Sequence, residues 1–171
     1  MEFQKLIGSL ERFQTVLPSL VHGLDEQAVR WKPESKNWSI LEIVCHLADE
    51  EVEDFRARVQ MTLQDPKQDW PTIDPVGVAD ERRYNDANFE EVLQRWVLER
   101  QNSVAWLREL KEPDWQQAYQ HPKYGPICAG EVLAAWAAHD HLHTRQIAKR
   151  LFEMTARDGK PFSIKYAGDW G

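Results

Sequence analysis

The segment HDHLH at residues 139–143 places three histidines within five positions. On a helix, successive side chains step by about 100°, so residues four apart share a face and residues two apart do not. His139 and His143 therefore point the same way, and His141 points away from both. Two imidazoles at this spacing occur in helical metal sites such as the H-E-x-x-H motif, although no glutamate follows His139 here. The pair is a candidate metal-binding pair, and we expect His141 to be an ordinary surface residue.

The surroundings of the pair allow two interpretations. Val132 and Trp136 share its face of the helix, so the pair lies along an apolar stripe that is expected to face the core. A single histidine there would at least as often be a hydrogen-bonded core residue. Two imidazoles on one buried face both need polar partners, however, and a shared cation supplies one. We therefore place metal binding ahead of the core interpretation.

A metal site built on this pair needs a third ligand from elsewhere in the chain. The candidates are His22, His46, His121 and the carboxylates. His46 lies in a predicted second helix, on the side opposite an apolar arc. That arc comprises Ile40, Leu41, Val44, Leu47, Val52, Phe55 and Val59. Periodicity alone therefore slightly favours a solvent-facing His46 on an acidic stripe, and a polar pocket inside a bundle is the alternative.

Helical periodicities predict the elements that carry these histidines. A first helix has apolar residues at three- and four-residue steps over residues 3–17, and Pro18 is expected to bend or end it. A second helix begins at a capping box formed by Ser39 and Glu42 and runs to about residue 63. Both helices are long enough to span a small domain.

Two further helices follow later in the chain. The third begins at the cap residue Asn88 and stops before Pro113. The fourth runs from about Ala129 to Leu151, and Cys128 at its cap position is a weak acceptor. Strand signals are sparse. Four helices of about 20 residues predict an all-α four-helix bundle.

The remaining segments are a long connection and a tail. Residues 64–87 form a Pro- and Asp-bearing connection between the second and third helices, which would permit a crossover to a non-adjacent helix. We predict one domain over residues 1–171, with a C-terminal tail from about residue 152 that packs on its own bundle or on a partner. Trp70 and Trp170, expected to be exposed aromatics, suggest a homodimer.

Composition narrows the class of protein. The chain has 21 basic and 28 acidic residues, a net charge of −7, and no basic cluster, which argues against nucleic acids and anionic membranes as partners. Cys45 and Cys128 form no metal or disulfide pattern, and the N-terminus is too polar for a signal peptide. No apolar run approaches the length of a membrane span. We therefore expect a cytoplasmic protein.

Two motifs, WSILEIVCHLADEE and YGPICAGEVLAAWAAHDHLHTRQI, resemble the DinB/YfiT-like superfamily over about residues 31–150. Members of that family are four-helix bundles with one histidine in the second helix and an H-x-x-x-H pair in the last. The resemblance implies that His46, His139 and His143 together bind a divalent metal ion. It also favours the pocket interpretation of His46.

The resemblance implies an enzyme and leaves its reaction open. Members include thiol transferases that use bacillithiol or mycothiol, and proteins assigned as hydrolases. Three neutral imidazoles leave coordination positions free, so a divalent ion (Zn, Ni, Fe or Mn) could activate water or bind a low-molecular-weight thiol as its thiolate. We expect thiol transfer or hydrolysis of a small molecule, with slightly more weight on the thiol route. The alternative is a non-catalytic bundle that binds a metal ion or a small ligand.

Residues near the predicted ligands receive assignments of their own. Glu50, one turn from His46, is a candidate general base or hydrogen-bond acceptor, although a solvated stripe with Glu53 paired to Arg56 or Arg58 is slightly favoured. Packing or capping roles, rather than roles in the site, are expected for Trp38, Cys45, Trp136, Asp140 and Gln146.

Overall fold

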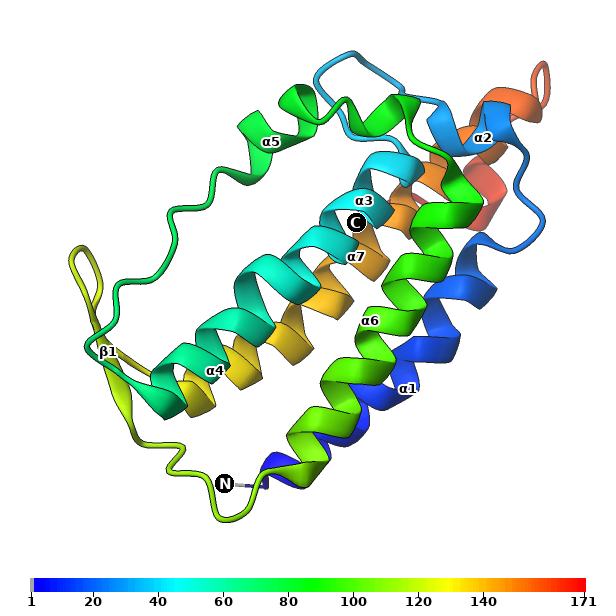
Figure 1. Cartoon of the computed structure of the whole chain (residues 1–171). Helices are drawn as coiled ribbons and strands as arrows, with labels where there is room; N and C mark the ends of the chain where they lie inside the picture. Colours follow the sequence, from blue (N-terminus) through cyan, green and yellow to red (C-terminus); the bar gives the residue numbers. More distant parts are fainter. Residues whose placement is uncertain (1) are drawn as a thin grey trace.

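The computed structural model describes residues 2–171 and confirms an all-α four-helix bundle (Figure 1). The four long segments are α1 (Phe3–Val21), the continuous run of α3 (Ile40–Asp49), η1 (Glu50–Arg56) and α4 (Ala57–Gln64), then α6 (Phe89–Glu109) and α7 (Ala129–Asp158). The shorter elements are α2 (Glu26–Arg30), α5 (Pro75–Glu81), η2 (Tyr84–Asp86), β1 (Ala118–His121), β2 (Gly125–Cys128) and η3 (Lys165–Ala167).

The path of the chain explains the long second connection. Helices α1 and α3 each pack against both α6 and α7, so α1 and α3 occupy opposite corners of the bundle. Figure 1 shows that the α3–α4 segment and α6 run in the same direction. Residues 65–88 must therefore return the chain along the full length of the bundle, and they carry α5 and η2 on the way. The connection leads to a neighbouring helix, so the chain does not make the crossover to a non-adjacent one that the length of the connection would permit.

The predicted caps are present. Ser39 Oγ accepts a hydrogen bond from Glu42 N at 3.1 Å, and Glu42 Oε2 accepts one from Ser39 N at 2.7 Å. Asn88 Oδ1 accepts one from Glu91 N at 3.2 Å. These side chains satisfy amide groups that lack partners inside the helix, which fixes the starts of α3 and α6.

Two helix ends and one hairpin differ from the sequence prediction. Helix α1 continues through Pro18 to Val21: the proline removes one hydrogen bond of the helix, but the buried Leu17 and Val21 hold the last turn against the core. Helix α7 extends to Asp158, because Leu151 and the buried Met154 continue its apolar stripe into the core. The antiparallel hairpin of β1 and β2, which precedes α7, was not predicted.

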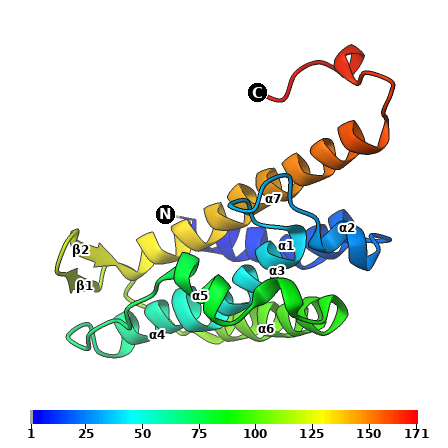
Figure 2. The same cartoon turned by 90° about the horizontal axis from the view of Figure 1, so that it is seen from above.

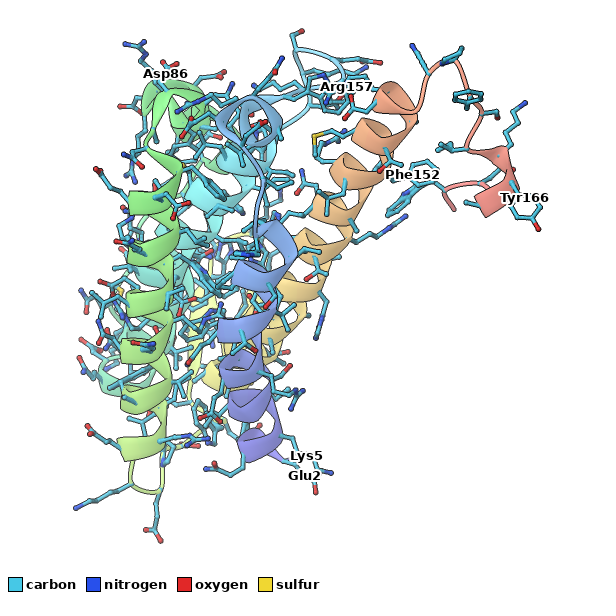
Figure 3. All side chains as sticks on the ribbon, turned by 90° about the vertical axis from the view of Figure 1, so that its right-hand side faces the viewer. Glu2, Lys5, Asp86, Phe152, Arg157 and Tyr166 are labelled. Atoms are coloured by element: carbon cyan, nitrogen blue, oxygen red, sulfur yellow. The ribbon has the colours of Figure 1, made fainter. Side chains whose placement is uncertain are left out.

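The tail begins after Asp158 and extends away from the bundle (Figures 2 and 3). Trp170 returns to pack on Phe152, with ring centroids 5.3 Å apart, whereas Tyr166 is fully exposed. Trp70 is only partly exposed and stacks on Tyr119 at 4.5 Å. The expected homodimer stays a prediction. Among residues 2–171, no helix combines the length and apolar character that crossing a membrane requires.

A buried ionic layer separates two apolar clusters in the core. Arg100 of α6 donates from Nε to Glu51 at 2.9 and 3.0 Å and makes two bonds to Asp140 of α7 at 2.7 and 2.8 Å. Glu51 also accepts a hydrogen bond from Trp136 Nε1 at 2.9 Å. The guanidinium and both carboxylates are almost completely buried. Arg100 Nη1 also donates to the carbonyl oxygen of Leu10 in α1 at 3.3 Å, so this layer joins all four long segments.

Candidate metal centre

Three imidazoles meet between α3 and α7. His46 Nε2 lies 3.2 Å from His139 Nε2, which lies 3.0 Å from His143 Nε2. The ligand atoms of all three lie within 4.8 Å of one another. The structure thus brings together the three histidines that the resemblance implies. His22, His121 and His141 lie outside this group.

Helix geometry explains the meeting. His139 and His143 are one turn apart on α7 and face α3. His46 is buried, because every residue of α3 is enclosed by the surrounding elements. The solvent-facing interpretation of His46 is therefore wrong. Periodicity missed this, because a helix that is covered on all sides need not be apolar on all sides.

The irregular middle of the second helical segment shapes the same site. Residues Glu50–Arg56 form a π-helix, whose turns take about one residue more than those of an α-helix. The wider turn rotates Phe55 away from the apolar arc and toward the histidines, where its ring lies 4.9 Å from that of His139. Trp38 flanks the other side, with its ring 4.9 Å from that of His46. The two aromatic rings thus flank the triad.

The donor set fits a divalent cation. Burial lowers the pKa of His46 to about 3, and burial together with its neighbouring histidines lowers the pKa of His139 to about 3. Burial also lowers the pKa of His143. All three imidazoles are therefore neutral at pH 7, the state that binds a metal ion. Nitrogens held about 2 Å from one tetrahedral ion stand about 3.3 Å apart, close to the two measured separations.

One side chain is hydrogen-bonded to an outer nitrogen of the triad, and a second lies near another without a hydrogen bond. Gln146 Oε1 lies 2.8 Å from His143 Nδ1, and Glu50 Oε1 lies 3.8 Å from His46 Nδ1. An acceptor at Nδ1 keeps the proton there and leaves Nε2 free to bind a cation. Gln146 was expected to pack or cap away from the site, so that assignment is wrong. Its i, i+3 spacing from His143 was the signal that the sequence offered.

We expect Gln146→Leu to weaken cation binding by about 10- to 100-fold, because the variant removes the acceptor that fixes the His143 ring. The measurement is a competitive zinc titration against a chromophoric chelator. Arg145→Leu is the matched control, since Arg145 is the exposed neighbour on the same helix. Equal affinities of the two variants would contradict the assigned role of Gln146.

A cavity of about 600 Å³ opens beside the histidines. Trp38, Phe55, Glu50, Asp54, Gln146 and Arg150 are among the residues that line it, together with the triad, Lys36 and Asn37. Trp38 packs against the core, as expected, and it also lines this cavity, which was not expected. The cavity has room for a small substrate as well as water.

Two carboxyl groups face this cavity from the π-helix. Glu50 is buried, and burial together with Asp54 raises the pKa of its carboxyl to about 8. Asp54 itself lies 2.7 Å from Arg58 Nε. The slightly favoured interpretation of Glu50 as a solvated surface residue is wrong, because the side chain lies inside the bundle beside His46.

Other assignments near the site hold. Trp136 is fully buried, and Asp140 packs in the ionic layer. Cys45 is buried, and burial raises the pKa of its thiol to about 12, which excludes a reactive thiolate at neutral pH. His141 is exposed, as expected.

Comparison with known proteins gives a family and a fold. A family model described as the DinB superfamily matches residues 9–147. A protein of Oceanobacillus iheyensis, provisionally named a metal-dependent hydrolase, is 23% identical over 150 residues, which are 84% of this chain and 84% of that protein.

Among solved structures, YfiT from Bacillus subtilis superposes with a TM-score of 0.79 at 19% identity, over 92% of this chain and 88% of that one. YfiT is described as a candidate metal-dependent hydrolase with an unusual four-helix bundle topology. At this identity the likeness supports the fold alone.

Proposed function

The chain belongs to the DinB superfamily, and we propose that it is a divalent-metal-dependent hydrolase of small molecules. The observation that carries the proposal is the convergence of three neutral imidazole Nε2 atoms at the wall of a cavity. The provisional name of the O. iheyensis relative points to the same class of reaction.

The residues present define what the site would do. His46, His139 and His143 would hold the cation. A divalent ion on three imidazoles keeps its full charge and open positions, so it lowers the pKa of bound water toward about 7 and polarises a carbonyl oxygen. Trp38 and Phe55 provide apolar walls beside the histidines, against which a substrate can pack.

Glu50 is the residue we assign to proton transfer. Its carboxyl lines the cavity beside the triad, within 3.8 Å of His46 Nδ1. With a pKa of about 8 the carboxyl is mostly protonated at pH 7, so it can give its proton to a leaving group, and its ionised form can accept a proton from a nucleophile. Asp54, one turn further along, lines the same wall and can orient that carboxyl.

The expected result of Glu50→Gln is a loss of about 100-fold in kcat with the cation retained, because glutamine keeps the shape of glutamate and cannot transfer the proton. The assay follows hydrolysis of small esters, amides and lactones by zinc-, nickel- and manganese-loaded protein. Glu53→Gln is the control, since Glu53 is exposed on the same π-helix. Full activity in Glu50→Gln would remove Glu50 from the mechanism.

Thiol transfer is the second candidate, and the size of the cavity is the observation that favours it. About 600 Å³ exceeds what water and a small ester require and accommodates a thiol together with an electrophile. Turnover of an electrophile by the metal-loaded protein with added thiol, and no hydrolysis without it, would select this reaction. A protein that binds the cation and catalyses neither reaction would be a non-catalytic metal-binding bundle.

A further inference from the structure

One end of the cavity is basic. Helices α3 and α7 run antiparallel, so residues before α3 lie level with the later part of α7 (Figure 1). Lys36 and Arg150 therefore line the cavity at one end, the histidines line its middle, and Glu50 and Asp54 line the other end. A small molecule bound across this cavity meets positive charge at one end and carboxyl groups at the other.

Arg150 is unusual among these residues because it is buried. It is 4% exposed, and its Nε has no hydrogen-bond partner among residues 2–171. Its Nη1 pairs with Glu153, which is more exposed. A buried guanidinium nitrogen without a partner is costly unless a ligand satisfies it. The side chain belongs to the same helix face as His139, His143 and Gln146, at steps of four, three and four residues.

The spacing suits one ligand that spans both groups. Seven residues of α-helix separate His143 from Arg150, a rise of about 10 Å, and a helical side chain leans back toward the N-terminus of its helix. The guanidinium therefore extends toward the histidines along the cavity wall. Trp38 lies between the two ends, with its ring parallel to that of His143 at 6.5 Å.

We infer that Arg150, assisted by Lys36, binds a carboxylate group of the substrate while the reacting group lies at the histidines. This inference rests on the proposed function and names a substrate class, small monocarboxylates. The local charges favour a single negative charge, because Glu153 and Glu34 already pair with Arg150 and Lys36. The positive charge that Arg150 and Lys36 have left would balance the two negative charges of a phosphate dianion less completely.

Cobalt-loaded protein provides a test that needs no turnover. Thiols bind such an ion as thiolates, release their proton to the buffer and change its visible absorption, so affinity is read directly. The probes are 2-mercaptoacetate, 3-mercaptopropionate and 4-mercaptobutyrate, each compared with the mercapto-alcohol of the same chain length. We expect at least one acid to bind tenfold or more tightly than its alcohol.

Variants assign this preference to Arg150. In Arg150→Gln the affinity for the acid should fall to that for the alcohol. The affinity for the alcohol should not change, and this result would also show that the site is folded. Arg150→Lys should retain part of the preference. Lys149→Gln removes one positive charge from an exposed position on the same helix and should bind like the wild type.

The inference would be overturned if the wild type bound acids and alcohols equally, or if the preference for acids survived in Arg150→Gln. It would also be overturned if inorganic phosphate displaced the acids at a lower concentration than acetate does. Failure to bind cobalt would instead refute the proposed function. In that case calorimetric titration of butyrate and butanol into metal-free wild type and Arg150→Gln decides whether Arg150 binds a carboxylate.

Discussion

His139→Ala and His143→Ala should each lose the cation, with affinity reduced by about 1,000-fold or more, whereas His141→Ala should bind like the wild type. The first two changes leave only two of three imidazoles whose Nε2 atoms converge. A two-ligand site on adjacent elements holds a divalent ion poorly, and hydrolysis should disappear with it. The measurement is elemental mass spectrometry of protein purified without a histidine tag.

His46→Ala completes this experiment, because His46 is the one ligand supplied by α3. About one divalent ion per chain in the wild type and none in His46→Ala would establish a site shared by the two helices. Equal loss in all variants, His141→Ala included, would mean that the histidines act through folding and not as ligands. No ion in the wild type after addition of zinc, nickel or manganese would make them core histidines.

Removal of ligands should affect metal binding more than folding. The three imidazoles stand close together with nitrogens 3.0 to 3.2 Å apart, which is a contact that neutral rings tolerate and charged rings would not. Each alanine variant relieves that crowding. Thermal unfolding of metal-free variants should therefore stay near that of the metal-free wild type, while the stabilisation that added zinc gives the wild type should be absent.

The bundle could be predicted because its signals are local. The apolar repeat of α1, the capping box at Ser39 and the cap at Asn88 each act within a turn or two of helix. The His139 and His143 pair is equally local, since both residues belong to one helix face. Only the resemblance to a family connected His46 to that pair.

The features that sequence reasoning missed depend on tertiary structure. The π-helix from Glu50 changes the phase of the second helix, so a constant 100° step misplaces Phe55. Arg150 lies within the predicted fourth helix but beyond the motif, and its burial depends on the elements that pack around it. A closer analysis of periodicity could have found Glu51, because it lies in the middle of the apolar arc of the predicted second helix, where only a paired charge can be buried.

The ionic layer carries the largest expected effect on stability. Arg100→Met should lower the free energy of unfolding by about 3 to 5 kcal/mol, because it leaves the buried carboxylates of Glu51 and Asp140 without their cation. Urea denaturation followed by circular dichroism measures this value. Arg108→Met is the control, because Arg108 lies on the same helix as Arg100 and forms an exposed ion pair with Glu11 of α1. Its loss should lower the free energy of unfolding by less than about 1 kcal/mol.

Replacing the whole ionic layer separates two contributions to the free energy of unfolding: the destabilisation by an unpaired buried charge and the stabilisation by the complete network. A variant with apolar residues of similar size at Arg100, Glu51 and Asp140 should be more stable than Arg100→Met alone, since no buried charge is left unpaired. It should still bind the cation less tightly than the wild type, because Asp140 directly follows the ligand His139 and its two bonds to Arg100 fix the rotation of α7 against α6. Full cation affinity in that variant would show that packing alone sets the rotation of α7, and that the buried charges contribute only to stability.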